Sequence, residues 1–175
     1  GMAHPEGYRK AIRLMKEAER CGRPVLCVVD TPGAYCGVGA EERGEGEAIA
    51  RSIACMTGLR VPILGVVTGE GGSGGALALA AGDRLGMLSN ALYSVISPRG
   101  FASILWKDPT REREAADAAR ITAEDLKDMG ICDDILPEPE GGAGEDLAGT
   151  AGRIRDFFLQ GLAELDGISG EDLLA

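Results

Sequence analysis

The chain has one histidine, few aromatic side chains and too few basic residues to balance its acids. Of 175 residues, 4% are Phe, Trp or Tyr, and 18 Lys and Arg stand against 28 Asp and Glu, which gives a net charge of −10. A chain this acidic does not hold nucleic acid or an anionic membrane surface by bulk electrostatics. We therefore expect neither a nucleic-acid partner nor a membrane partner.

Long apolar runs and paired cysteines are also missing. No stretch approaches the roughly 20 apolar residues of a membrane-spanning helix, and no basic-then-apolar leader opens the sequence. The five cysteines, at positions 21, 27, 36, 55 and 132, form no C-x-x-C pair. This spacing argues against a zinc site or a disulfide framework and is typical of reduced thiols in a cytoplasmic protein. Because only one histidine accompanies them, we expect no metal site on this chain.

What the chain does have is an ordinary globular balance, with 45% hydrophobic and 26% charged residues, and 27 glycines. The length fits one domain. The charge is uneven, because the segment from residue 138 to 175 holds nine acidic residues and two arginines. We therefore divide the chain into a core over residues 1–142 and an acidic C-terminal helical tail over residues 143–175.

Apolar spacing predicts alternating helices and strands. Helices are predicted after Pro5, around residues 49–56, at 76–81, after Ser97, from Thr122 to Gly130, and around 154–165. Buried strands are predicted at residues 25–29, 61–68, 85–88, 93–97 and 131–136. This alternation indicates an α/β fold with a parallel sheet.

A glycine run, Gly69-Glu70-Gly71-Gly72-Ser73-Gly74-Gly75, separates a predicted strand from a predicted helix. Its G-x-G-x-x-G pattern is typical of dinucleotide binding, which requires an acid about 20 residues further on, and residues 88–98 contain none. Its G-x-S-x-G pattern matches a nucleophile elbow at Ser73, but the one histidine, His4, precedes it. A third interpretation is that the glycines only let a helix pack closely on a sheet. We expect Ser73 to be a helix N-cap rather than a nucleophile.

All three interpretations share the same backbone chemistry. Consecutive glycines before a buried helix leave N–H groups at its N-terminus with no side chain in the way. Such donors, aided by the helix dipole, can hold a phosphate, a carboxylate or a developing oxyanion. That role requires no acid–base side chain.

Six blocks in order make the sequence specific enough to compare with a family. They are Asp30-Thr31-Pro32-Gly33-Ala34-Tyr35, Gly39-Ala40-Glu41-Glu42-Arg43-Gly44, Gly69 to Ala78, Tyr93-Ser94-Val95-Ile96-Ser97-Pro98, Ala102-Ser103-Ile104-Leu105-Trp106-Lys107 and Pro137-Glu138-Pro139. Together they resemble the alpha subunits of bacterial acetyl-coenzyme A carboxylase carboxyltransferases. The resemblance runs from Gly1 to about Gly142 and continues more weakly into the tail.

The resemblance implies a crotonase-like (ClpP/crotonase) α/β fold of repeated β-β-α units that lacks its first strands. It implies transfer of a carboxyl group from carboxybiotin, on a separate biotin carboxyl carrier protein, to acetyl-CoA, giving malonyl-CoA for fatty acid biosynthesis. The chain would act only with a zinc-containing beta subunit, in an α2β2 assembly with the active site between the subunits. A cytoplasmic location and an association with ATP binding are also implied.

The resemblance also assigns residues. Gly74 and Gly75 would carry the catalytic amides, which stabilise negative charge on the ureido oxygen of biotin. The cofactor-binding residues it implies are Gly71, Gly72, Tyr35 and Tyr93. For the two tyrosines, packing alone is an equal alternative to lining a biotin pocket. Because biotin nitrogen or the carboxylate can take the acetyl proton, no protein base is required.

Two positions depart from the family pattern. Cys36 stands where the family usually has Pro, and Arg99 stands where it usually has Glu, which reverses a charge beside the helix start at Ser97. Two alternative functions remain open. One is a subunit of another biotin-dependent acyl-CoA carboxylase or decarboxylase, and the other is a non-catalytic assembly subunit.

Overall fold

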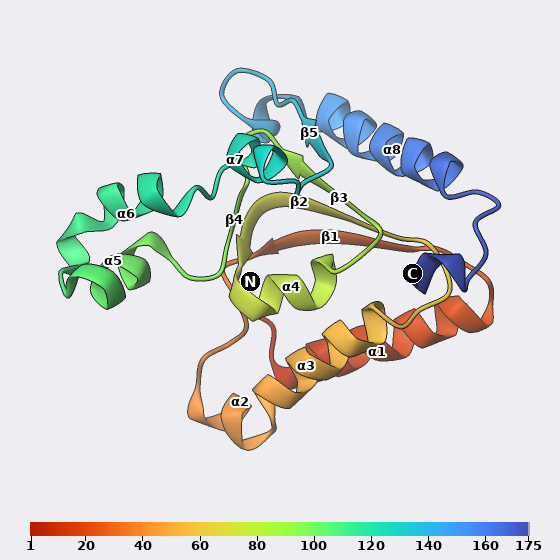
Figure 1. Ribbon diagram of the computed structural model, residues 1–175, viewed down its shortest axis with the longest axis horizontal. Coiled ribbons are helices and arrows are strands. Elements are labelled where there is room, and N and C mark those ends of the chain that lie inside the picture. Colours follow the sequence, from red (N-terminus) through yellow and green to blue (C-terminus); the bar gives the residue numbers. More distant parts are fainter. Residues whose placement is uncertain (175) are drawn as a thin grey trace.

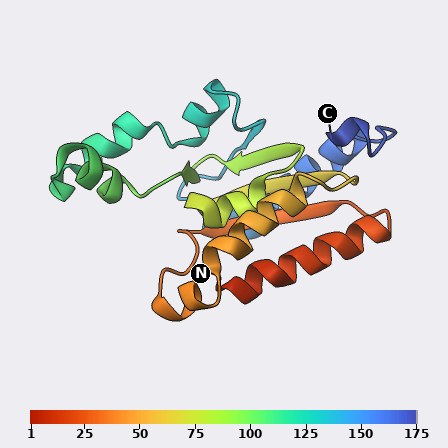
Figure 2. The same ribbon diagram turned by 60° about the horizontal axis from the view of Figure 1, so that its bottom comes forward.

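The computed structural model describes residues 1–174 and contains a five-stranded parallel sheet with helices on both faces (Figures 1 and 2). The strands are β1 (Val25–Thr31), β2 (Ile63–Gly72), β3 (Arg84–Leu88), β4 (Leu92–Ser94) and β5 (Asp134–Leu136). The α-helices are α1 (Pro5–Arg20), α2 (Val38–Glu42), α3 (Glu45–Met56), α4 (Ser73–Ala80), α5 (Pro98–Trp106), α6 (Glu112–Ala119), α7 (Ala123–Asp128) and α8 (Leu147–Glu164). Short 3-10 turns lie at Pro109–Arg111, Ala143–Asp146 and Asp172–Leu174.

The central strand β2 organises the sheet, whose order is β1-β2-β3-β5. The first half of β2 pairs with β1 and β3, and its last three residues pair with β4. The strand therefore continues through Gly69 to Gly72, where the sequence predicts a loop. That prediction was wrong because neighbouring strands supply hydrogen bonds on both sides, and pairing outweighs the low strand preference of glycine.

The two faces of β2 meet different helices. Leu64 contacts α8, since a side chain on Gly161 would overlap Leu64. The next residue, Gly65, faces α4 at Ala80, with α1 and α3 packed outside α4. The main core cluster joins strand residues such as Val66 and Met87 to the aromatic pair of α8, Phe157 and Phe158. The tail helix therefore covers the sheet.

The outer strand β1 is less well covered. Leu26 and Val28 lie on the α8 side of the sheet, in register with Leu64 and Val66 of β2. They remain 47% and 61% exposed because α8 packs mainly over β2 and β5. One apolar face of this edge strand is open.

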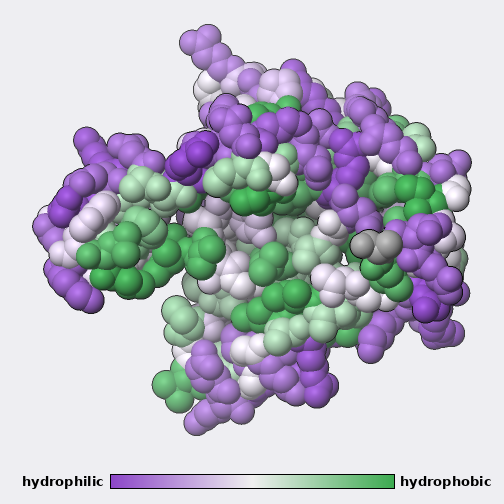
Figure 3. Space-filling view, in the orientation of Figure 1, coloured by the Kyte–Doolittle hydropathy of each residue, from purple (hydrophilic) through white to green (hydrophobic). Residues whose placement is uncertain are grey.

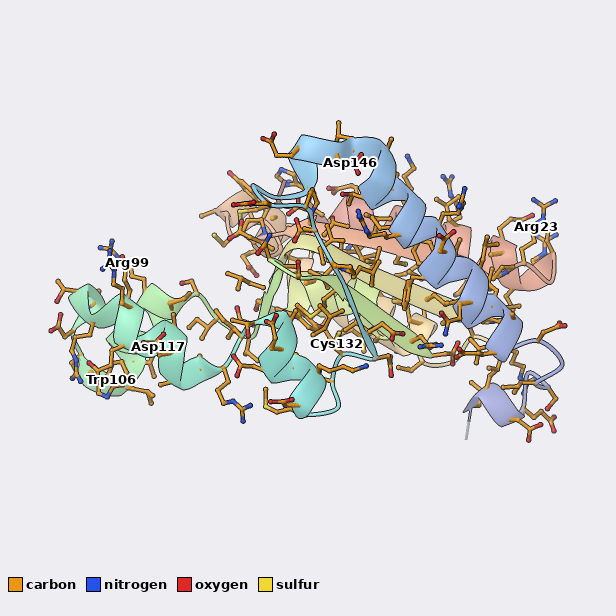
Figure 4. All side chains as sticks on the ribbon, turned by 90° about the horizontal axis from the view of Figure 1, so that it is seen from above. Arg23, Arg99, Trp106, Asp117, Cys132 and Asp146 are labelled. Carbon is orange, nitrogen blue, oxygen red and sulfur yellow. The ribbon has the colours of Figure 1, made fainter. Side chains whose placement is uncertain are left out.

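Helices α5 and α6, with the turn between them, form a projection that we call the arm (residues 98–119). It extends from the sheet at the left of Figure 1. Ala102 and Ala115 are fully buried in it, and the Arg111 guanidinium lies 4.3 Å from the centre of the Trp106 ring. Figure 4 shows Arg99, Trp106 and Asp117 together on the arm, away from Cys132 in the body. The sequence did not predict α6.

The strand predicted at 93–97 ends at Ser94, because the chain then leaves the sheet for the arm. At the base of the arm, the Tyr93 N–H donates a hydrogen bond to the Ile121 carbonyl (3.0 Å). This bond links the segment that enters the arm to the segment that leaves it. The strand predicted at 131–136 is likewise shorter and begins at Asp134. Within residues 1–174, no helix combines the length and the apolar character needed to cross a bilayer.

Candidate active site at the start of helix α4

An apolar cavity of about 400 Å³ opens where β2 passes into α4. Its walls come from α4, β4, the arm and α7, four parts of the chain that the sheet brings together. The lining residues are Ser73, Gly74, Leu77, Tyr93, Ser94, Val95, Ile96, Phe101, Ala119, Arg120, Ile121, Leu126, Met129 and Ile131. A concave, mainly apolar site with a few polar groups is the usual form of a small-molecule site.

A second cavity, of about 280 Å³, lies against the other side of the same turn. It is more polar and includes Pro32, Glu70, Gly71 and Gly72. The residues common to both cavities are Ser73, Ser94, Val95, Ile96 and Ile121. The β2–α4 turn is thus the wall between two adjoining spaces.

The first amides of α4 have no hydrogen-bond acceptor in the described part of the chain. The N-cap is Gly72, and the N–H groups of Gly74 and Gly75 donate to no acceptor within residues 1–174. The first amides of a helix have no intrahelical partner, so they need water, a side chain or a ligand. Of the two glycines, only Gly74 lines the larger cavity.

Gly75 lies behind Gly74, against the backbone that follows β1. A side chain on Gly75 would overlap the Ala34 nitrogen. The Gly75 carbonyl accepts a hydrogen bond from the Tyr8 hydroxyl (3.3 Å). Burial raises the pKa of that phenol to about 12, with the nearby Glu45 carboxylate adding to the effect, so Tyr8 stays a neutral donor. The structure separates the two predicted catalytic glycines into one on the cavity and one packed behind it.

The other two glycines of the run are set by close packing. A side chain on Gly72 would overlap the Pro32 carbonyl, and one on Gly71 would come within 2.7 Å of the Tyr93 ring. The interpretation that these glycines permit tight packing therefore holds for Gly71, Gly72 and Gly75. It does not explain Gly74, whose nearest neighbour would be a methyl group of Ile49 at 3.4 Å.

The two predicted tyrosines lie in different places. Tyr93 lines the larger cavity, and burial raises the pKa of its phenol. Tyr35 is 43% exposed and stacks on His4 with ring centres 4.3 Å apart. Tyr35 lines neither cavity at this turn, so its role in ligand binding stays a prediction.

Ser73 is neither an N-cap nor part of a catalytic triad. Gly72 is the N-cap, so the prediction that Ser73 caps the helix was wrong. Ser73 is instead the first residue of the helix, and its φ is +55°. His4 contacts Tyr35 and Arg43, and no histidine lines the cavity. A serine hydrolase mechanism has no base here.

Sequence reasoning missed the far walls of the cavity. Phe101 and Ala119 come from the arm, and Met129 follows α7. Arg120 also lines the cavity with a φ of +50°, but Asp125 (3.0 Å) and Asp128 (3.7 Å) hold its guanidinium. No local signal links these residues to the glycine run, because only the sheet brings them near it.

Metal-ligating groups do not gather anywhere in the described part of the chain. Among residues 1–174, no three side chains of the His, Cys, Asp and Glu types converge in the way that a metal ion needs. The polar residues that line the two cavities include Ser73, Ser94, Glu70 and Arg120.

Two curated relatives from different organisms carry the same description. A carboxyl transferase subunit alpha of acetyl-coenzyme A carboxylase from Clostridium perfringens is 56% identical over 174 residues, which is 99% of this chain and 64% of that protein. The corresponding subunit from Carboxydothermus hydrogenoformans is also 56% identical, and the match covers 54% of it. The chain thus spans between about half and two thirds of the relatives it matches.

Solved structures confirm the predicted crotonase-like α/β fold. A transcarboxylase 12S structure superimposes with a TM-score of 0.80 at 20% identity, covering 94% of this chain and 31% of that one. A malonate decarboxylase hetero-dimer from Pseudomonas gives a TM-score of 0.80 at 23% identity, covering 99% and 72%. The family model described as acetyl co-enzyme A carboxylase carboxyltransferase-like matches residues 1–175. The chain therefore belongs to the acetyl-coenzyme A carboxylase carboxyltransferase family.

Proposed function

We propose that this chain forms part of an acetyl-CoA carboxylase carboxyltransferase alpha subunit, which moves a carboxyl group from carboxybiotin to acetyl-CoA to give malonyl-CoA for fatty acid biosynthesis. One observation carries the proposal. The Gly74 amide has no protein acceptor within residues 1–174 and lies on an apolar cavity of about 400 Å³, in a chain of this family. Removing one such donor from an oxyanion site typically lowers the rate by ~10²–10³.

The cavity suits biotin by size and polarity. When bound, carboxybiotin supplies the carboxyl group that is transferred. Leu77, Ile96 and Phe101 offer apolar surface for the body of a small bicyclic ligand. The Gly74 N–H offers a hydrogen bond to an oxygen atom that bears negative charge, with Gly75 as the second proposed donor. Gly71 and Gly72 hold the turn that presents these amides.

We infer that the active assembly also contains a zinc-bearing beta subunit and a biotin carboxyl carrier protein, in an α2β2 arrangement. The word alpha in the relatives' names supports a beta partner. Exposed apolar side chains beside the cavity support a covering surface, since Val95 is 85% exposed and Ile104 and Leu105 of the arm are 59% and 57% exposed. Figure 3 shows hydrophobic residues gathered on the arm and on the adjoining face. A cytoplasmic location fits this role. ATP binding stays a prediction that no described residue supports.

A cavity-filling variant tests the proposal. The full-length protein, mixed with a candidate beta subunit, is assayed for malonyl-CoA-dependent carboxylation of free biotin. Ala119→Trp places a large ring into the cavity from its arm wall, and we expect biotin carboxylation to fall at least tenfold. Ala118→Trp is the matched control, because Ala118 is exposed on the same helix and does not line the cavity. We expect that control to keep wild-type activity.

The other outcomes separate the alternative functions. Complex formation is followed by gel filtration for every variant. A stable complex without activity in the wild type would support the assembly subunit. Loss of CO2 from malonyl-CoA without biotin carboxylation would support a decarboxylase subunit. Equal activity in the two tryptophan variants would remove the cavity from the mechanism.

A further inference from the structure

Ser73 stands out within the glycine run because of its backbone conformation. It is the only non-glycine residue from Gly71 to Gly75, and it alone among these five has a positive φ, at +55°. A residue with a Cβ atom is strained in this conformation, whereas glycine adopts it freely. The chain therefore keeps a side chain at the one position of the run where glycine would relieve strain.

That side chain does nothing for the fold that the structure shows. Ser73 is exposed, and its hydroxyl caps no helix and has no hydrogen-bond partner among residues 1–174. Ser73 lines both cavities, and Gly74, the next residue in the chain, lines the larger one. A strained residue without a structural partner, placed in a cavity, points to a ligand contact.

The chemistry of this contact follows from its surroundings. No histidine lines either cavity, so the histidine base of a serine nucleophile is missing from both. A neutral hydroxyl beside a free amide instead offers a second hydrogen bond to one anionic group. Arg120 is the cationic residue among those that line the cavities, and its guanidinium forms ion pairs with Asp125 and Asp128.

We infer that the Ser73 hydroxyl donates a hydrogen bond to the carboxyl group during its transfer, and that its strained backbone holds it on the wall between the two cavities. This inference rests on the proposed function. No covalent bond to Ser73 forms, and its proton stays on the hydroxyl throughout. Ser73 thus contacts the transferred group directly, beside the Gly74 amide.

Two substitutions separate this role from a structural one. Ser73→Gly removes the hydroxyl and relieves the strain, whereas Ser73→Ala removes the hydroxyl and keeps the strain. In the full-length protein with its beta partner, we expect both to lower kcat for biotin carboxylation roughly 10- to 100-fold, with little change in KM for malonyl-CoA. We expect Ser73→Gly to raise the melting temperature by about 2–4 °C, and Ser73→Ala to leave it unchanged.

Lys107→Gly is the matched control for strain relief. Lys107 has a φ of +58° at the end of α5 and lines neither cavity. We expect it to stabilise the protein without changing kcat. If the unmutated assembly is active and Ser73→Gly has the same kcat, the inference about Ser73 is overturned, while the proposed function is not. An inactive wild-type assembly would overturn the proposed function and the inference with it.

Discussion

At the scale of single residues, the glycine run serves two purposes that its composition cannot distinguish. Gly72 and Gly75 allow the backbone after β1 to approach α4, since side chains there would meet Pro32 and Ala34. Gly74 has room for a methyl group, so close packing does not require glycine there. Gly74 instead lines the larger cavity. Sequence reasoning predicted that the run presents backbone amides to a ligand. It could not tell the glycines needed for close packing from the one that lines the cavity, because that distinction depends on where residues 32–34 lie.

This difference can be measured by alanine substitution. We expect Gly72→Ala to destabilise the fold by about 3 kcal/mol, because its methyl group would meet the Pro32 backbone, which cannot move aside. Gly74→Ala should be neutral or stabilise the helix by up to ~1 kcal/mol. Urea denaturation followed by circular dichroism checks both values. Equal destabilisation by the two alanines would contradict this division.

At the scale of elements, apolar periodicity predicted most helices and strands, because those segments bury one face. Helix α1, for example, buries Tyr8 and Met15 as its spacing indicates. The predictions failed where partners decide the structure. β2 extends through glycines because β1 and β4 pair with it, and α6 has only one fully buried residue, Ala115, to mark it.

The start of α3 packs a carboxyl group against α1 in an unusual way. Glu45 is 3% exposed, and neither of its carboxylate oxygens has a hydrogen-bond partner. Burial raises its pKa, with smaller opposing effects from His4 and Arg43 and reinforcing effects from Glu41 and Glu6. The folded state therefore binds this proton more tightly than the unfolded chain does.

Stability should then fall as pH rises from the ordinary carboxyl range through the raised pKa of Glu45. Glu45→Gln keeps the shape and removes the charge, so we expect it to be more stable than wild type at pH 7 and nearly equal to it at pH 4. Urea midpoints measured across this pH range test the expectation. Parallel pH profiles for the two proteins would show that Glu45 does not cause the slope.

At the scale of the whole molecule, the sequence predicted a parallel α/β fold, whereas the cavity depended on contacts between distant segments. Residues 73–77, 93–96 and 119–131 line one space only because β4 pairs with the end of β2. The acidic helical tail over residues 143–175 places Phe157 and Phe158 in the main core. Long-range packing of this kind leaves no local pattern to read.

Thiol reactivity reports on this packing across the molecule. Cys21 and Cys36 are exposed, whereas burial raises the pKa of the Cys27 thiol to about 11. At pH 8 we expect iodoacetamide to label Cys36 at least ~100-fold faster than Cys27, because the thiolate is the reactive form. Peptide mass spectrometry follows each site. In urea the rates should converge, and equally rapid labelling of Cys27 in the native protein would contradict the position of β1.

The arm supplies part of the cavity wall while keeping a small core of its own around Ala102 and Ala115. Its two connections are joined at the Tyr93–Ile121 hydrogen bond, where the sheet ends. A tilt of the arm about this base would widen or narrow the entrance without breaking any strand pairing. If the cavity binds the proposed ligand, substitutions that stiffen this base should change binding strength and release rate while touching neither the amides nor the reacting groups.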